Sequence, residues 1–182
     1  MPLSYPPLAD TEWPAAIAQM RQGFAGKLNV YRVMAYHPAL LSAWSALRQH
    51  VVVGNALGPQ RSEVAILRTG HRLGSEYEWS HHVVRARACG MSDARIASIA
   101  GPLDGMSAED AIIARAVDEM FDSKRIGEAS VEALAMLVGT EGVFDVIATV
   151  GMYSTLGYIV NSFRTPVDPD VAGELENRPL GT

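Results

Sequence analysis

Residues 61–91, RSEVAILRTGHRLGSEYEWSHHVVRARACGM, decide the fold and contain most of the ionisable side chains that can perform chemistry. The run 61–72 predicts a helix, because its apolar centre is flanked by polar residues on both sides. Gly74 ends that helix, and Ser75 begins a second one as its N-cap, with a glutamate three residues later as in a capping box. Gly90 closes the second helix. We therefore predict two consecutive helices joined by a short glycine turn.

The second helix predicts a polar face. Glu78 and His82 are four residues apart and so share one side of the helix, and Arg85 continues that side. His81 is their neighbour in sequence and points about 100° away, so we expect it at the surface or at an interface. Glu63 on the preceding helix is a further candidate partner for His82.

Composition narrows the possible classes of protein. A chain of 182 residues with 48% hydrophobic residues is expected to form one globular domain with a sizeable core. The net charge of −5 and the absence of a Lys/Arg cluster give no electrostatic case for nucleic acid or an acidic membrane surface. Cys89 is the only cysteine, so no internal disulfide can form. The first residues do not resemble a signal peptide, and we expect a cytoplasmic protein.

The rest of the chain also predicts helices. Residues 1–10 and the tail from Thr165 are proline-containing and are expected to be extended arms. Period-2 strand patterns are absent, and apolar residues recur at helical spacing. The expected fold is an all-α single domain over 1–182, with seven or eight helices and a core at about 28–168. The additional helices are expected near 11–23, 29–36, 38–53, 93–100, 107–120, 128–138 and 140–160.

The run 143–160, VFDVIATVGMYSTLGYIV, is the most apolar part of the sequence. A membrane span needs about 20 uninterrupted apolar residues. Asp145, two glycines and the polar pair at 154–155 interrupt this run. We therefore expect a helix buried in the core or in a subunit interface.

The stretch LGPQRSEVAILRTGHRLGSEYEWSHHVVRARACGMS resembles the signature of the carboxymuconolactone decarboxylase family, which includes the alkylhydroperoxidase D-like proteins. The matching features are Arg61-x-Glu63, the run Glu-Tyr-Glu-Trp at 76–79, and His82 followed by small residues and a glycine. The flanking segments VYRVMAYHPALLSAW and GMYSTLGYIVNSF are similar too. The resemblance covers most of 28–168. It implies an alkylhydroperoxidase D-like helical bundle that assembles into a homo-oligomer, a trimer or a hexamer.

The sequence departs from the peroxidase branch of this family. That branch has a glutamate, a Cys-x-x-Cys pair and a histidine, which fall here on Glu63, Ser75, Glu78 and His82. Both thiols are missing, whereas dithiol peroxide reduction needs a thiolate and a resolving thiol. Cys89 lies eleven residues beyond Glu78 and has no partner. The sequence therefore argues against an alkylhydroperoxidase-like peroxidase.

The decarboxylase branch implies acid–base chemistry on a small carboxylated lactone-like or aromatic-catabolism compound, without a cofactor. Glu63, Glu78 and His82 are the candidate catalytic residues, with His82 as the proton donor, because burial and neighbouring charges bring such groups toward neutral pH. The class expected is a lyase, or a related isomerase or hydrolase. The candidate substrate-binding residues are Arg61, Arg68 and Arg85 for a carboxylate, with Tyr77 and Trp79 as pocket walls.

Each candidate also has a structural interpretation. Glu63 can form an ion pair between helices, Glu78 can complete the capping box of Ser75, and His82 can be a hydrogen-bonded core histidine. In that case the protein is a non-catalytic binding or assembly relative of the family. Adjacent histidines at 81 and 82 face different ways, so only Glu78 and His82 have chelating spacing and no metal is expected. The expected partner is a small-molecule substrate.

Overall fold

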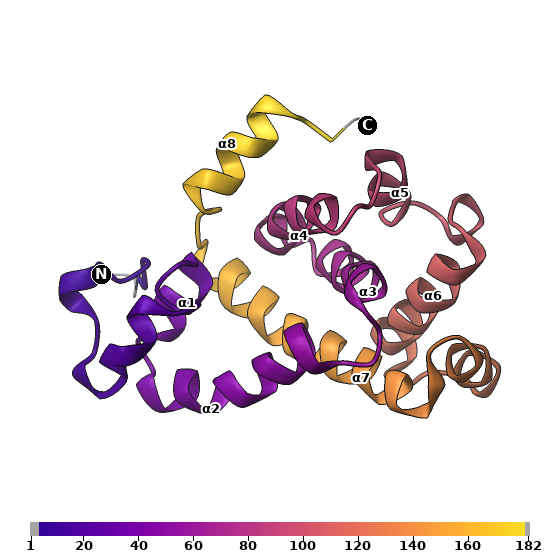
Figure 1. The fold of residues 1–182 in the computed structure, drawn as a ribbon, viewed down its shortest axis with the longest axis horizontal. Helices are drawn as coiled ribbons and strands as arrows, with labels where there is room; N and C mark the ends of the chain where they lie inside the picture. Colours follow the sequence, from indigo (N-terminus) through magenta and orange to yellow (C-terminus); the bar gives the residue numbers. More distant parts are fainter. Residues whose placement is uncertain (1–3, 181–182) are drawn as a thin grey trace.

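The protein is helical throughout the part that the computed structural model describes, residues 4–180, and that part contains no β-strand (Figure 1). Short 3-10 segments η1 (Asp10–Glu12), η2 (Ala15–Gln22) and η4 (Leu103–Gly105) and a π-turn η3 (His50–Gly54) accompany the α-helices. The all-α prediction is confirmed. The α-helices are α1 (Asn29–Met34), α2 (Pro38–Gln49), α3 (Pro59–Arg72), α4 (Glu76–Ala88), α5 (Asp93–Ser98), α6 (Ala108–Ser123), α7 (Glu128–Phe163) and α8 (Pro169–Asn177).

Helices α3 and α4 lie at the centre of the fold, as predicted from residues 61–91 (Figure 1). Helix α3 packs against α4, α6 and α7 and is buried continuously from residue 62 to residue 70. Ser75 caps α4 by accepting a hydrogen bond from the backbone of Glu78. A Cβ atom at Gly70 would lie 3.3 Å from Cβ of Glu78. The glycine therefore permits the close approach of the two helices that brings their polar side chains together.

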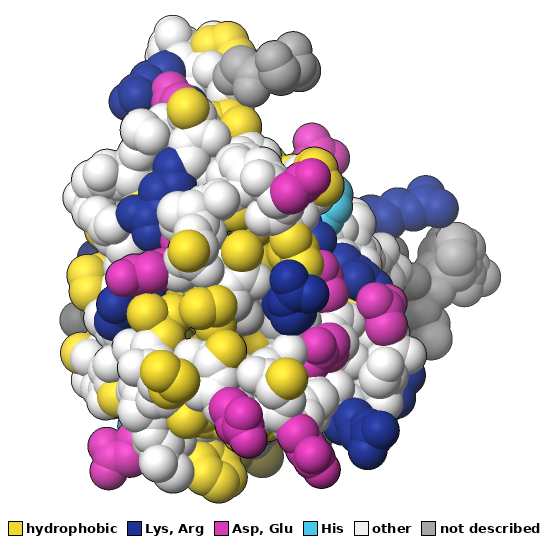
Figure 2. All heavy atoms as spheres, turned by 90° about the vertical axis from the view of Figure 1, so that its right-hand side faces the viewer, with side chains coloured by type: hydrophobic (Ala, Val, Ile, Leu, Met, Phe, Trp, Pro, Cys, Tyr) yellow, Lys and Arg dark blue, Asp and Glu magenta, His cyan; other side chains and the backbone are white. Residues whose placement is uncertain are grey.

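Helix α7 is long and apolar enough to cross a membrane by length and composition. However, Gly139 interrupts it with φ 74° and ψ 172°, and the helix packs against α1, α3, α4 and α6. Figure 2 views the side that carries α6 and the beginning of α7, where acidic and basic side chains are interspersed with hydrophobic ones. The prediction of a core helix agrees with this packing.

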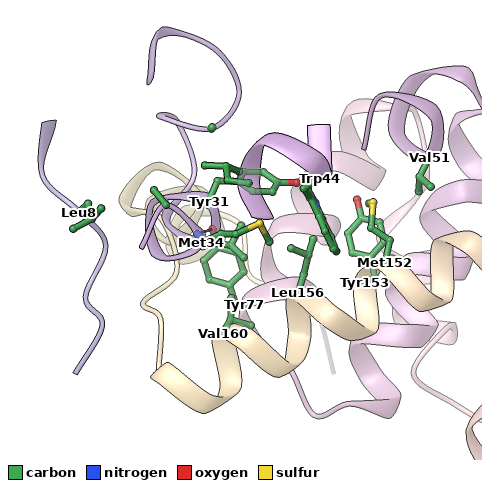
Figure 3. Packing of buried hydrophobic residues seen from close by; sticks show 14 of the residues in the cluster. Leu8, Tyr31, Met34, Trp44, Val51, Tyr77, Met152, Tyr153, Leu156 and Val160 are labelled. Atoms are coloured by element: carbon green, nitrogen blue, oxygen red, sulfur yellow. Dashed lines mark hydrogen bonds between the residues drawn. The ribbon is translucent and has the colours of Figure 1, made fainter. Parts of the chain in front are cut away.

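The buried hydrophobic residues form two clusters. The first joins α1, α2 and the end of α7, and Figure 3 shows Tyr31, Trp44 and Leu156 packed within it. The second joins α3, α4, α5, α6 and the earlier part of α7, and includes Leu67, Ile96 and Leu134. Helices α3 and α4 contribute to both clusters. Polar side chains on these two helices are therefore surrounded by apolar packing, which makes them costly unless they are satisfied.

The two ends of the chain differ in how well they match the predictions. Residues 4–9 have no regular structure, as expected, and residues 1–3 of the predicted N-terminal arm lie outside the described residues. The segment expected as helix 11–23 consists of 3-10 turns, with Ile17 at φ −127° and ψ 26°. The extended C-terminal arm is a wrong prediction for 169–177, which form α8. Pro169 is compatible with a helix there because it occupies the first turn, where its missing N–H costs nothing.

Asp168, just before α8, anchors the C-terminal segment to the core. Its carboxylate accepts hydrogen bonds from the Tyr77 hydroxyl at 2.6 Å and from the backbone N–H of Asn29 at 3.0 Å, and its Oδ2 lies 2.6 Å from Nε2 of His81. Burial opposes ionisation of this carboxyl, yet the hydrogen bonds from His81, Tyr77 and Asn29 outweigh it and lower its pKa. The expectation that His81 lies at the surface is wrong, since its side chain is buried in this network.

Replacing Asp168 with alanine should destabilise the fold strongly. The change leaves the buried donors of Tyr77 and His81 without an acceptor, and loss of one partner from a buried charged network costs about 3–5 kcal/mol. Thermal and urea unfolding of Asp168→Ala measure this loss. Glu176→Gln, an exposed change on α8, is the matched control and should unfold like the wild type. Equal stability of Asp168→Ala and the control would contradict the anchoring role.

Candidate active site

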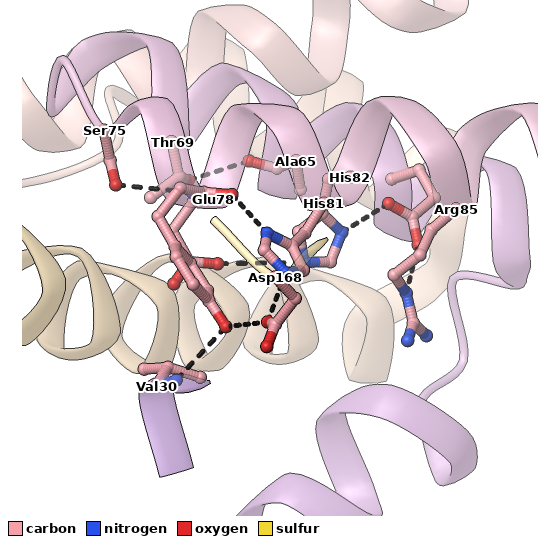
Figure 4. Close-up of polar contacts among 11 residues, drawn as sticks. Val30, Ala65, Thr69, Ser75, Glu78, His81, His82, Arg85 and Asp168 are labelled. Carbon is pink, nitrogen blue, oxygen red and sulfur yellow. Dashed lines mark hydrogen bonds and ion pairs between the residues drawn. The ribbon is translucent and has the colours of Figure 1, made fainter. Parts of the chain in front are cut away.

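The centre of the site is a contact between α3 and α4. Nδ1 of His82 lies 2.6 Å from Oε2 of Glu63, and both side chains are buried (Figure 4). Arg85, one turn further along α4, donates from Nε to the other oxygen of Glu63 at 3.4 Å. Each oxygen of the Glu63 carboxylate therefore has a partner. The predicted grouping of Glu63, His82 and Arg85 is what the structure places together.

Glu78 lies on the opposite side of the His82 ring. Its Oε2 is 3.8 Å from Nε2 of His82, too far for a hydrogen bond, and its Oε1 is buried with no hydrogen-bond partner among residues 4–180. Burial raises the pKa of the Glu78 carboxyl to about 8, so the group is protonated at neutral pH. The side chain points into the site, so its role is not that of a capping-box acceptor.

The electrostatics of His82 assign it a different role from the one expected from the sequence. Burial lowers the pKa of the imidazole, and this outweighs the opposing effect of the Glu63 carboxylate. A neutral ring that contacts a carboxylate through Nδ1 donates its proton there, which leaves the lone pair on Nε2. The tautomer follows from this hydrogen bond. His82 is thus arranged as a base and Glu78 as the acid, so the prediction of His82 as proton donor is corrected.

Two cavities reach these groups. One, of about 280 Å³, is lined by Glu63 and Arg85 among others. The second, of about 130 Å³, is lined by Glu78, His82 and Arg85. Tyr153 of α7 lines both cavities, and its ring meets that of His82 edge-on with 4.9 Å between the centroids. A small molecule in either cavity can therefore approach the acid–base groups.

Tyr77 forms part of the wall of the smaller cavity, as expected, but its hydroxyl is already used. The hydroxyl donates to Asp168 and accepts a hydrogen bond from the backbone N–H of Val30 at 3.1 Å. Burial and the contact with Asp168 raise the pKa of this hydroxyl far above its usual range. Tyr77 therefore supports the site through its ring and its position.

The structure does not bring Arg61, Arg68 and Trp79 to this site. Arg68 donates to Asp118 at 2.6 Å and to the backbone carbonyls of Ile99 and Gly101, so its guanidinium is fully engaged between helices. Arg61 pairs with an exposed glutamate on α6 at 3.1 Å. Trp79 lines a separate surface hollow. Sequence reasoning placed these residues near the site by proximity in the chain, which does not fix the direction of a side chain.

Other residues of the site were missed. Tyr153 and Arg48 come from α7 and α2, far from the central motif in sequence, and both line the smaller cavity. Asp168 was overlooked because it lies in a segment expected to be extended. The only sequence signal for these residues was their polar or aromatic character within the apolar runs of 38–53 and 143–160.

Cys89 does not take part in the site. It lies at the end of α4, its Sγ contacts the carbonyl of Ala86 at 3.2 Å, and burial raises the pKa of its thiol. A raised pKa leaves little thiolate at neutral pH, which opposes reactivity. Within residues 4–180, no group of three or more His, Cys, Asp or Glu side chains has the geometry to hold a metal ion.

Glu78→Gln should change how stability depends on pH. A carboxyl whose pKa is 4.5 in the unfolded chain and about 8 in the fold stabilises the fold fully below the lower value. That stability is lost as pH rises toward 8, by up to about 1.4 kcal/mol per pH unit. The glutamine has no such loss, so the variant should gain on the wild type from pH 5 to pH 8 in urea unfolding. Glu76→Gln, exposed on the same helix, should follow the wild type, whereas parallel profiles of wild type and Glu78→Gln would refute the burial argument.

Comparison with known proteins agrees with this fold. Crystal structures of the debrominase Bmp8 superpose with TM-scores of 0.72, in complex with 2,3,4-tribromopyrrole, and 0.74 without ligand, at 14% and 13% identity. The first covers 97% of this chain and 98% of Bmp8, and the second covers 94% and 96%. An uncharacterized peroxidase-related protein from Silicibacter sp. TM1040 superposes with a TM-score of 0.78 at 14% identity, covering 94% of this chain and 93% of that one.

No curated protein matches the sequence. A family model does match, over residues 38–120, which extend from α2 to α6 and include Glu63, Glu78 and His82. The resemblance read from residues 61–91 is thereby confirmed: residues 38–120 of this chain are a region of the carboxymuconolactone decarboxylase family.

Proposed function

We propose that this protein is a cofactor-free acid–base enzyme that acts on a small carboxylated compound, by decarboxylation or a related lyase, isomerase or hydrolase step. The observation that carries the proposal is the pairing, within one buried site, of a protonated Glu78 and a neutral His82 held by Glu63. Pairs of titratable groups whose environments separate their protonation states are typical of general acid–base sites.

The arrangement supports a simple proton inventory for a decarboxylation. The bond between the carboxylate carbon and its neighbour breaks, CO₂ leaves, and the electron pair moves into a conjugated carbonyl of the substrate. Glu78, the protonated group, donates a proton to the carbon or oxygen that gains the charge, and His82 returns a proton from water to Glu78. For an isomerisation, His82 Nε2 removes a proton and Glu78 donates one at another atom. Either sequence ends with the site in its starting state.

Arg85 supports the choice of an anionic substrate. Its guanidinium lines both cavities, and Glu63 occupies only its Nε, at 3.4 Å. The remaining N–H groups suit a carboxylate, which guanidinium binds in a planar two-point geometry. The debrominase with the same fold is known with a tribromopyrrole, a small planar ring. Cavities of about 280 and 130 Å³ suit a compound of that kind.

A non-catalytic binding or assembly relative is the second candidate. The observation in its favour is that Glu63 is already bonded to His82 and Arg85, as in a structural ion network. A peroxidase of the dithiol type has less support, because the single thiol lies outside the site and has a raised pKa. The acid–base proposal is preferred because Glu78 Oε1 has no partner within residues 4–180, whereas a structural network would satisfy it.

Loss of the base should abolish turnover while the fold is retained. His82→Gln and Glu63→Gln should each lower turnover by at least about 100-fold, since general acid–base groups contribute on that order. The measurement is turnover of small lactones, muconate-like diacids and keto acids, with helical content checked by circular dichroism. His71→Gln, exposed on α3, is the control and should keep wild-type rates. If wild type converts none of these compounds, and His82→Gln only lowers the melting temperature, the binding-module candidate is favoured.

We further propose a cytoplasmic homo-oligomer, a trimer or a hexamer. Support comes from one face of α7, on which Phe144, Ile147 and Tyr158 are 67%, 44% and 60% exposed. Large exposed apolar side chains that recur along one helix face are typical of interaction surfaces. The single cysteine is compatible with a reducing compartment.

Phe144→Glu should dissociate this assembly, because a charge placed in an apolar interface is costly to bury. Sedimentation velocity should give a trimer or a hexamer for the wild type and a monomer for the variant. Glu132→Gln, an exposed change on the earlier part of α7, should sediment like the wild type. A monomeric wild type would refute the proposed assembly.

A further inference from the structure

Arg48 is a cation in the site that the central motif does not contain. It lies on α2, and its guanidinium carbon is 4.1 Å from the centre of the Phe24 ring and 5.9 Å from that of Tyr31. Its Nε is buried and has no hydrogen-bond partner among residues 4–180. The stacking fixes the plane of the guanidinium, since the ring faces attract the cation. It does not supply an acceptor for the N–H groups.

The acidic side chains near Arg48 do not neutralise it. Arg48 lines the smaller cavity together with Glu78, His82 and Arg85. Glu78 is protonated at neutral pH and carries no charge. Asp168 is occupied by Tyr77, His81 and the Asn29 backbone, and Glu63 by His82 and Arg85. No ion pair of Arg48 with a carboxylate occurs in the described chain.

A partly buried cation without an anion is unfavourable in an otherwise apolar wall. The other buried arginine of the central helices shows the contrast, because Arg68 is saturated by a carboxylate and two backbone carbonyls. Arg48 is fixed in direction but left with free donors beside a cavity. That combination is expected of a binding group whose partner arrives with a ligand.

We propose that Arg48 holds the non-reacting carboxylate of the substrate, while the reacting end of the molecule lies between Glu78 and His82. This inference deepens the proposed function, because it names the substrate class: a small carboxylate whose reactive group is distant from at least one carboxylate. The guanidinium suits this role better than an ammonium, since it binds a carboxylate through two parallel hydrogen bonds. Tyr31 and Phe24 keep it oriented from the side away from the ligand.

The binding test uses benzoate and cis,cis-muconate as probes, with benzamide as the uncharged match of benzoate. Isothermal titration should detect the carboxylates but not benzamide with the wild type. Arg48→Gln should weaken carboxylate binding by about ten- to a hundred-fold, the range expected for losing charged hydrogen bonds, and Arg48→Lys by less. Arg61→Gln removes a surface arginine of the same charge and should bind like the wild type. Equal affinity of Arg48→Gln and wild type would overturn the proposal.

A second measurement does not depend on a variant folding or on one probe. In ¹⁵N NMR of the wild type, the buried Nε–H of Arg48 should shift when formate or benzoate is added at constant ionic strength. An unchanged Arg48 signal with both anions would overturn the inference. The outcome is separable from that of the proposed function, because His82→Gln should keep carboxylate binding while losing turnover. Binding that fails only in Arg48→Gln supports the anchor even if no lyase activity is found.

Discussion

The fold depends on the contact between His82 on α4 and Glu63 on α3, because it joins two central helices through buried polar atoms at 2.6 Å. That distance is possible only where the helices approach closely, and Gly70 allows this by having no Cβ against Glu78. The contact also fixes which nitrogen of the imidazole carries the proton, and therefore which one faces Glu78. The geometry of the helix pair and the protonation of the site are thus one property.

Two buried carboxyl groups beside α4 show how local donors decide ionisation. Both Glu78 and Asp168 are desolvated, yet the pKa of the first is raised to about 8 and that of the second is lowered. Asp168 receives hydrogen bonds from side chains and a backbone N–H, whereas an oxygen of Glu78 receives none from the described residues. Burial alone favours the neutral acid, and burial with donors favours the anion. The fold therefore places a structural anion and a protonated acid on neighbouring faces of one helix.

Helical periodicity and capping allowed the central pair of helices and the grouping of Glu63, Glu78 and His82 to be predicted, since both signals are local. The partners of Arg68 were not predictable, because Asp118 comes from α6 and meets it only through tertiary packing. His81 was expected at the surface because helical spacing turns it away from His82, but α8 covers that face and Asp168 accepts its proton. The direction of the proton between Glu78 and His82 required burial, which a sequence does not contain. Arg48 lay in a helix predicted only for its apolar residues.

The resemblance gives a chemical reason for the residue found at position 78. In the peroxidase branch a thiol corresponds to Glu78, and a thiol has an ordinary pKa of about 8.5. Burial brings the Glu78 carboxyl to about 8, so the position retains a group that holds a proton at neutral pH beside the same histidine. What is lost is redox chemistry, because a carboxyl cannot form a sulfenic acid or a disulfide. A scaffold that keeps the proton at this position and removes the sulfur retains the capacity for proton transfer, which is the chemistry that a decarboxylation requires.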